Sequence, residues 1–379
     1  MPVRFFLLFL PLVLCAPTVD ITVRVWYREA RLCNHNVFIR GDLCGLSWDV
    51  GTILTHKGND NWESTLHCTA SDAGKTISMK VLVDDSQWQV GTNDQFIVPT
   101  RSGGVAELYP WFFTSKGSYE LMDGGEVFSP QLNNTRPVVV YTPPSYLENP
   151  HKPLRHLLVM HDGQNLFNDS TSFIGEAWRV QEAADELITG GQTDEFLIVG
   201  PYNTADRMNE YTYSYDPKYQ VGGKGDLYLQ FVRETLLPLV QKRYRLTADA
   251  TLGMMGSSLG GLISCYEGWR PTQEHPFSRL GCISSTFDWN SEDFLNVVMP
   301  RAGAPKPAPL TYLDSGDVGD DLDDRDQTIR VRDAMTKKYH LGDTTQYYLD
   351  HGAAHNERYW GKRVWRPLLM FYQPTPRVF

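Results

Sequence analysis

The chain has 379 residues, of which 41% are hydrophobic and 12% aromatic, and this length favours two domains, each with its own core. Its formal net charge is −10, from 35 basic and 45 acidic side chains. Nucleic acids and anionic membrane surfaces attract basic proteins, so this charge balance argues against both as partners.

The first residues predict a secretory signal peptide over residues 1–16. One basic residue, Arg4, precedes an almost entirely apolar stretch at residues 5–16, which ends in small side chains. A transmembrane anchor is the alternative, but crossing a bilayer takes about 20 apolar residues and this run has roughly a dozen. No later segment is apolar enough to span a membrane. We therefore expect a secreted, extracellular protein without a membrane span.

Secretion would give a role to the cysteines and to two glycosylation sequons. In an oxidising compartment two of the cysteines at positions 33, 44 and 68 can pair, and Cys265 can pair with Cys282 if a helix packs on the next strand. None of these cysteines has the Cys/His spacing of a zinc site. Asn133 and Asn168 each begin a sequon, so we expect a glycoprotein if a eukaryote secretes the chain.

Residues 17–115 predict a small all-β sandwich domain. Apolar and polar residues alternate in residues 21–27 and again in residues 75–83, a pattern typical of strands with one buried face. Turn-forming residues cluster between such runs, as at residues 58–61. Short antiparallel strands in two packed sheets are therefore expected.

Part of this region resembles the starch-binding type of carbohydrate-binding module. The resemblance is carried by residues 37–42, Trp48-Asp49, Trp62-Glu63, residues 80–85, Trp88 and Asn93. In such modules exposed tryptophans stack on the apolar faces of sugars, so the resemblance implies glycan binding. The alternative is that Trp48, Trp62 and Trp88 fill the sandwich core, where large aromatic residues of alternating strands usually point.

Residues 116–379 predict an α/β domain with a mostly parallel sheet. Apolar runs typical of buried strands alternate with helical stretches, at residues 138–141, 157–160, 196–199, 252–255, 310–313 and 346–349. One intervening helix is predicted by apolar residues that recur at helical spacing, namely Leu229, Phe231, Val232, Leu236 and Val240. Helices are expected on both faces of this sheet.

A nucleophile motif follows the fourth of these strands. Gly256-Ser257-Ser258-Leu259-Gly260 has the pattern G-x-S-x-G between a strand and a helix, the setting in which α/β-hydrolases present a serine on a tight turn. Side chains at positions 256 and 260 would collide in such a turn, so both positions need glycine. Ser258 is the predicted nucleophile, and the adjacent helix N-terminus would stabilise negative charge.

The general base is expected after the last strand, where residues 351–357 contain two histidines. His355 is favoured because it lies farther into the loop, where Asn356, Glu357 and Trp360 can hold it, whereas His351 adjoins the strand end. A carboxylate must accept the imidazole N–H. The loop after residues 310–313 contains several candidates: Asp314, Asp317, Asp320, Asp321, Asp323, Asp324 and Asp326.

Two further loops carry candidate binding residues. Residues 161–167 follow the second strand, where this fold supplies an oxyanion-hole amide, so we expect the oxyanion to be bound by the N–H of Leu259 and that of Gly163 or Gln164. The candidate substrate-binding residues are Arg207, Glu210 and Trp360. The alternative is that Arg207 and Glu210 form an ion pair with each other and do not line the substrate pocket.

Three of these motifs together resemble the putative esterase family, which includes enterochelin esterases, feruloyl esterases, S-formylglutathione hydrolases and antigen 85 mycolyltransferases. They lie at residues 160–167, 256–261 and 352–357. The resemblance implies an α/β-hydrolase fold with Ser258 as nucleophile and His355 as base. The family's acid loop matches best at Asp323, with Asp320 second.

We expect ester hydrolysis through an acyl-serine intermediate, on a small-molecule or glycan-linked ester. No cofactor and no metal are predicted; calcium on the acidic loop is an alternative, but the loop lacks the ordered glycine and glutamate of an EF-hand. Two other functions remain open: a secreted carbohydrate-binding protein with an inactive hydrolase scaffold, and an acyltransferase.

Overall fold

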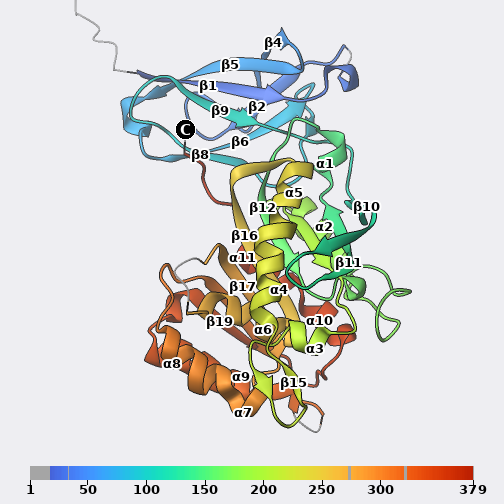
Figure 1. Ribbon diagram of the computed structural model, residues 1–379. Helices are drawn as coiled ribbons and strands as arrows, with labels where there is room; N and C mark the ends of the chain where they lie inside the picture. Colours follow the sequence, from blue (N-terminus) through green and yellow to red (C-terminus); the bar gives the residue numbers. More distant parts are fainter. Residues whose placement is uncertain (1–17, 33, 272–274, 320–321, 379) are drawn as a thin grey trace, which may run out of the picture. The chain divides into compact units, whose positions relative to one another are not determined.

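The computed structural model describes residues 18–32, 34–271, 275–319 and 322–378, which form two compact units (Figure 1). Unit 1 contains the described residues up to 89, with 93–112 and those from 375 on, and unit 2 contains 90–92 and 113–374. The predicted signal peptide and Cys33 lie outside the described residues. Within the described ranges, no helix is both long and apolar enough to cross a bilayer.

Unit 1 is the predicted all-β sandwich. Its strands are β1 (Thr18–Trp26), β2 (Val37–Gly41), β3 (Thr52–Ile53), β4 (Thr55–Gly58), β5 (Asn61–Thr69), β6 (Thr76–Val83), β7 (Gln87–Trp88), β8 (Asp94–Ile97) and β9 (Gly104–Leu108). One sheet has the order β4-β5-β1-β9 and the other β3-β2-β6-β7, with β8 also paired to β6. The sequence predicted antiparallel strands only, but β1 and β9 pair in parallel.

The period-two pattern of unit 1 places one face of each strand in a shared core. Every second residue of β1 is buried, and these residues cluster with the inward residues of β2 and β6. Trp62 belongs to this core, with only 5% of its surface exposed, whereas Trp48 and Trp88 are 36% and 40% exposed. The alternative that these tryptophans fill the sandwich core is therefore correct for Trp62 and wrong for Trp48 and Trp88. Cys44 and Cys68 form a disulfide.

Unit 2 contains the predicted, mostly parallel sheet. Its strands are β10 (Ser118–Ser129), β11 (Asn134–Thr142), β12 (Leu154–Met160), β13 (Leu197–Pro201), β16 (Leu246–Ser258), β17 (Phe277–Ser285), β18 (Leu310–Ser315) and β19 (Thr345–Leu349), in the order β10-β11-β13-β12-β16-β17-β18-β19. All pairs from β13 to β19 are parallel, and β10 and β11 pair antiparallel. Parallel neighbours bring the carboxyl ends of β12, β16, β17, β18 and β19 to one edge.

Helices connect these strands. They are α1 (Ser145–Glu148), α2 (Val180–Thr189), α3 (Arg207–Glu210), α4 (Gly225–Phe231), α5 (Leu237–Arg243), α6 (Leu259–Trp269), α7 (Trp289–Asp293), α8 (Met299–Ala302), α9 (Arg325–Asp333), α10 (Glu357–Arg363) and α11 (Trp365–Phe371). A π-helical turn, Val232–Leu236, joins α4 to α5, so the helix predicted from apolar spacing is confirmed. A small hairpin, β14 (Tyr215–Asp216) and β15 (Val221–Gly222), precedes α4.

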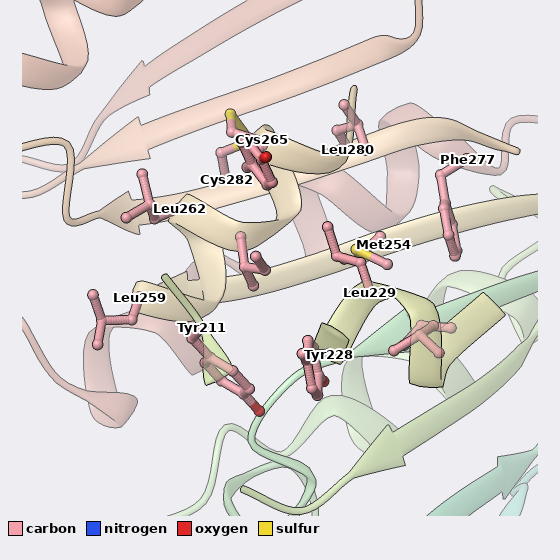
Figure 2. Close-up of a cluster of buried hydrophobic side chains, with 14 of the residues drawn as sticks. Tyr211, Tyr228, Leu229, Met254, Leu259, Leu262, Cys265, Phe277, Leu280 and Cys282 are labelled. Carbon is pink, nitrogen blue, oxygen red and sulfur yellow. A yellow bond between two sulfur atoms is a disulfide. The ribbon is translucent and has the colours of Figure 1, made fainter. Parts of the chain in front are cut away.

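The core of unit 2 fixes the strand and the helix on either side of the nucleophile motif. Leu262 of α6 lies in one buried cluster with Met254 of β16 (Figure 2). A disulfide between Cys265 of α6 and Cys282 of β17 crosses this layer, the pairing expected from a helix packed on the next strand. The turn between β16 and α6 is thus anchored on both sides.

Removing this cross-link should destabilise unit 2. The two cysteines are 17 residues apart in sequence, and the loss of such a link typically costs about 2–4 kcal/mol of unfolding free energy, mainly because the unfolded chain gains freedom. We expect Cys265→Ala/Cys282→Ala to lower the urea midpoint and to speed amide hydrogen exchange in α6 and β17. The control, Cys44→Ala/Cys68→Ala, should leave exchange in these two elements unchanged; wild-type exchange in the first variant would contradict the expectation.

Candidate active site

Ser258 lies on a strained turn between β16 and α6. Its φ of 58° and ψ of −127° are rarely adopted by residues other than glycine. A Cβ at Gly256 would lie 2.8 Å from the carbonyl carbon of Gly260 and 2.9 Å from Cδ2 of His161, and one at Gly260 would lie 3.2 Å from Cβ of His161. The predicted need for glycine is therefore confirmed at position 256, and position 260 leaves little room for a side chain.

The hydroxyl of Ser258 has a hydrogen-bond partner that the sequence did not reveal. Its Oγ lies 3.1 Å from Oγ1 of Thr286, which directly follows β17. No hydrogen bond joins Ser258 to His355, both of which are within the described part of the chain. In free hydrolases the contact between nucleophile and base is often long and tightens only with substrate. No motif includes Thr286, so only the sheet register could reveal it.

His355 is paired with a buried carboxylate. Its Nδ1 lies 2.5 Å from Oδ1 of Asp323, whose side chain is fully buried. The indole of Trp360 packs edge-on against the imidazole, with ring centroids 5.0 Å apart. The structure thus brings together the favoured histidine and the first-choice aspartate. Asp320, the second choice, lies outside the described residues.

The competing residues of these two loops have other partners. The imidazole of His351 is 79% exposed and lies 2.7 Å from a carboxylate oxygen of Asp317. Asp314 is buried, and Nε and Nη2 of Arg363 donate to its two carboxylate oxygens, each at 3.0 Å. Neither aspartate contacts His355 in the part of the chain that the structure describes.

Hydrogen bonds keep the buried Asp323 in its charged form. Burial acts to raise the pKa of this carboxyl, but the hydrogen bond and charge of His355, with donors from Ser284 and Gly316, outweigh burial and hold the pKa below its usual value. An ionised Asp323 accepts the proton on Nδ1 of His355. The Nε2 atom is then left to accept a proton.

The predicted oxyanion loop is anchored by an ion pair. Asp162 has a left-handed backbone, φ 57°, and accepts hydrogen bonds from Arg207 at 2.8 and 2.9 Å and from Asn203 at 2.6 Å. The 3-10 turn Gly163–Asn165 begins directly after it. The N–H groups of Gly163 and Gln164 belong to its first turn and that of Leu259 begins α6, so each precedes the first intrahelical hydrogen bond.

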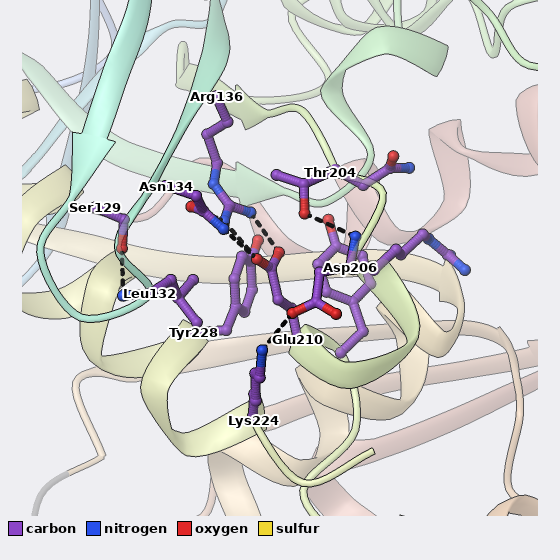
Figure 3. Close-up of polar contacts among 12 residues, drawn as sticks. Ser129, Leu132, Asn134, Arg136, Thr204, Asp206, Glu210, Lys224 and Tyr228 are labelled. Carbon is purple, nitrogen blue, oxygen red and sulfur yellow. Dashed lines mark hydrogen bonds and ion pairs between the residues drawn. The ribbon is translucent and has the colours of Figure 1, made fainter. Parts of the chain in front are cut away.

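The candidate substrate-binding residues have mainly structural contacts. Arg207 forms the ion pair with Asp162 rather than with Glu210. Glu210 is fully buried and accepts hydrogen bonds from both Nη atoms of Arg136 at 2.9 Å and from Asn134 at 2.7 Å (Figure 3). The prediction that Glu210 contacts substrate is therefore wrong. Trp360 is 5% exposed and donates from its indole to Ser284.

Metal ligands do not converge in the described parts of the chain. Residues 18–32, 34–271, 275–319 and 322–378 contain no group of three or more His, Cys, Asp or Glu side chains arranged to hold a metal ion. Asp314, at the end of β18, accepts from Arg363, and in the loop after β18 Asp317 lies against His351 and Asp323 against His355.

Both a family model and a curated protein match the greater part of this chain. The model of the family described as Putative esterase matches residues 129–370 of this chain. The uncharacterized protein YbbA of Bacillus subtilis (strain 168) is 22% identical over 248 residues, covering 62% of this chain and 92% of YbbA.

Two solved structures share the fold. The IroE-like serine hydrolase from Shewanella oneidensis has a TM-score of 0.51 and 18% identity, covering 67% of this chain and 80% of its own. The siderophore hydrolase EstB from Aspergillus nidulans has a TM-score of 0.52 and 17% identity, covering 69% and 97%. At these identities the likeness extends to the fold alone.

The histidine beside the nucleophile turn is neutral. His161 is buried, its Nδ1 lies 2.8 Å from the hydroxyl of Tyr228, and burial lowers its pKa to about 3. In the unfolded chain a histidine titrates near about 6.5. Below that pH the unfolded state binds a proton that the folded state does not, so His161 makes stability fall as the pH drops from about 6.5 towards about 3.

We predict that His161→Asn will reduce this pH dependence. Between pH 7.5 and 4.5 the wild type should lose about 2–3 kcal/mol of unfolding free energy through His161, and the variant should not lose this part. Urea unfolding at the two pH values measures the difference. His351→Asn is the control, because that imidazole is 79% exposed. Equal losses in wild type and His161→Asn would contradict a neutral buried His161.

Proposed function

We propose, since the chain belongs to the Putative esterase family, that it hydrolyses carboxylic esters through an acyl-serine intermediate. The observation that carries this proposal is the hydrogen bond from His355 to the buried Asp323, in a sheet that also presents Ser258 on a strained turn. A turn of this kind exposes a serine for attack, and a histidine paired with a carboxylate acts as general base. These groups need no cofactor.

The proposed reaction has two steps with the same base. Nε2 of His355 takes the hydroxyl proton as Ser258 Oγ attacks the ester carbonyl carbon, and the N–H groups of Leu259 and of Gly163 or Gln164 bind the oxyanion. The intermediate collapses, and the alcohol leaves with the proton from His355. Water then attacks the acyl carbon, again giving its proton to His355; the bond to Ser258 Oγ breaks, Oγ takes that proton back from His355, and the acid is released. Asp323 stabilises the imidazolium in both steps.

The setting of this reaction is proposed to be extracellular. The signal peptide predicted over residues 1–16 supports secretion, and so do the disulfides Cys44–Cys68 and Cys265–Cys282, because disulfides persist mainly in oxidising compartments.

Small-molecule esters are the proposed substrates. Siderophore esters belong in the test panel because EstB, which shares the fold, is a siderophore hydrolase. Transfer of the acyl group to an alcohol instead of water would use the same first step.

Substitution of the proposed triad should abolish turnover of p-nitrophenyl acetate and butyrate. We expect kcat/KM to fall about 1000-fold or more in Ser258→Ala and His355→Ala and, because the imidazole loses its acceptor, in Asp323→Asn. Ser257→Ala should retain activity and serves as the control. Circular dichroism should confirm that each variant folds.

An ester panel with feruloyl, acetyl-sugar and siderophore substrates would follow, with and without an acceptor alcohol. Free acid as the main product supports hydrolysis, and a new ester indicates acyl transfer. Equal activity in wild type and Ser258→Ala would contradict the proposed mechanism.

We also propose that unit 1 binds glycans. The exposed indoles of Trp48 and Trp88 lie with ring centroids 6.2 Å apart at an interplanar angle of 31°. Arg40 holds the pair, because its guanidinium lies 5.2 Å from the Trp88 ring centroid and donates to the Trp48 carbonyl at 2.9 Å, while Asp85 accepts from it at 2.8 Å. Flat aromatic faces fixed in this way suit the apolar faces of sugar rings.

Calorimetric titration with soluble starch oligosaccharides tests this second function. Trp48→Ala/Trp88→Ala should lower affinity at least about tenfold, on the scale of about 1.4 kcal/mol. Val105→Ala, an exposed residue on β9 of the other sheet, is the control. Absence of binding to the wild type by any glycan of a wider array would remove this function. Glycan binding by a protein inert towards all esters would favour a binding protein with an inactive hydrolase scaffold.

A further inference from the structure

A bulge in β17 redirects the side chain of Ser284. Opposite β16 the register passes from Ser257–Ile283 to Ser258–Ser285, so Ser284 has no partner on that strand. Its φ is 39°, and its side chain is fully buried. A bulge changes the direction of a side chain and occurs often beside active sites, and a left-handed backbone at a residue other than glycine costs on the order of 1 kcal/mol or more.

The hydroxyl of Ser284 is surrounded by two donors and one acceptor. Its Oγ lies 3.0 Å from Nε1 of Trp360, 2.6 Å from Nη2 of Arg363 and 2.6 Å from Oδ2 of Asp323. An indole N–H and a guanidinium can only donate hydrogen bonds. Oγ therefore accepts from both, and its own proton can only go to the carboxylate. Unlike most hydroxyl groups, this one has a single possible orientation.

Arg363 and Asp314 hold Ser284 in this position. Arg363 donates to both oxygens of Asp314 at 3.0 Å, and Asp314 accepts the backbone N–H of Ser284 at 3.1 Å. Nη2 of Arg363 lies 3.7 Å from Oδ2 of Asp323, too far for a hydrogen bond but close enough for charge attraction. Ser284 is thus the hydrogen-bonded link between this buried ion pair and Asp323.

We propose that Ser284 is a positioning residue that binds Oδ2 of Asp323, and so reserves Oδ1 for Nδ1 of His355. This inference rests on the proposed ester hydrolysis. The same Oδ2 also accepts the backbone N–H of Gly316, so Ser284 is the side-chain donor of the two. A carboxylate held at one oxygen cannot rotate away from the imidazole, which keeps the Nδ1–H tautomer and leaves Nε2 to accept the proton of Ser258. The imidazolium that Asp323 stabilises exists only during the reaction, so Ser284 acts on kcat and not on KM.

The test compares Ser284→Ala with Ser285→Ala. Ser285 is the matched control: it adjoins Ser284, is also fully buried, and its Oγ has no hydrogen-bond partner within the described residues. We expect kcat on p-nitrophenyl butyrate to fall about 10- to 100-fold in Ser284→Ala, as for a lost charge-assisted hydrogen bond, with KM within about twofold. Ser284→Gly, which accepts the positive φ, repeats the test if the alanine variant does not fold.

Proton NMR separates this inference from the proposed reaction. In wild type and in Ser258→Ala, the Nδ1 proton of His355 should give a low-field signal because of its short hydrogen bond to Asp323. Ser284→Ala should move or broaden that signal, and Ser285→Ala should not. An unchanged kcat in an active enzyme, or an unchanged signal, would overturn the positioning role. If the wild type hydrolyses no ester, the proposed reaction fails and the NMR signal alone decides whether Ser284 positions Asp323.

Discussion

The hydrogen bond between His355 and Asp323 joins two loops, and the candidate site depends on it. One loop follows β18 and the other follows β19, and these strands are parallel neighbours, so both loops leave the same edge of the sheet. Because β16 lies in the same parallel run, its end at Ser258 emerges at that edge as well. The register of the sheet, rather than distance along the chain, therefore brings Ser258, His355 and Asp323 to the same edge.

Close packing at the nucleophile turn imposes a second constraint. The imidazole of His161 fills the space beside Gly256 and Gly260, so a methyl group at either glycine would meet it or the opposing backbone. A charged imidazole could not remain in that dry position without a paired anion, and burial accordingly lowers the pKa of His161. The turn thus combines a strained backbone at Ser258 with an uncharged, tightly packed support.

Three ion pairs, two of them buried, engage charged residues of unit 2. Arg207 anchors Asp162 at the oxyanion loop, Arg136 holds Glu210 at the end of α3, and Arg363 holds Asp314 at the end of β18. Removing one member of such a pair leaves an uncompensated charge, which is strongly destabilising. Each pair joins residues that are 45 or more positions apart. Spacing along the sequence therefore gives no indication of the partner, and the role of Glu210 as the partner of Arg136 is visible only in the tertiary structure.

The sequence by itself determined the two kinds of fold, because period-two and buried-strand patterns are local consequences of backbone geometry. It also determined the nucleophile turn, through the glycines at positions 256 and 260, and the preference for His355. It also identified the helix that contains Leu229. Family resemblance ranked Asp323 first among the aspartates, but only the tertiary structure showed that it pairs with His355. Tertiary structure also separated Trp62 from Trp48 and Trp88, and it placed Thr286 beside Ser258 and Ser284 beside Asp323. These outcomes depend on strand register, a bulge and burial, which are properties of residues brought together from distant parts of the chain.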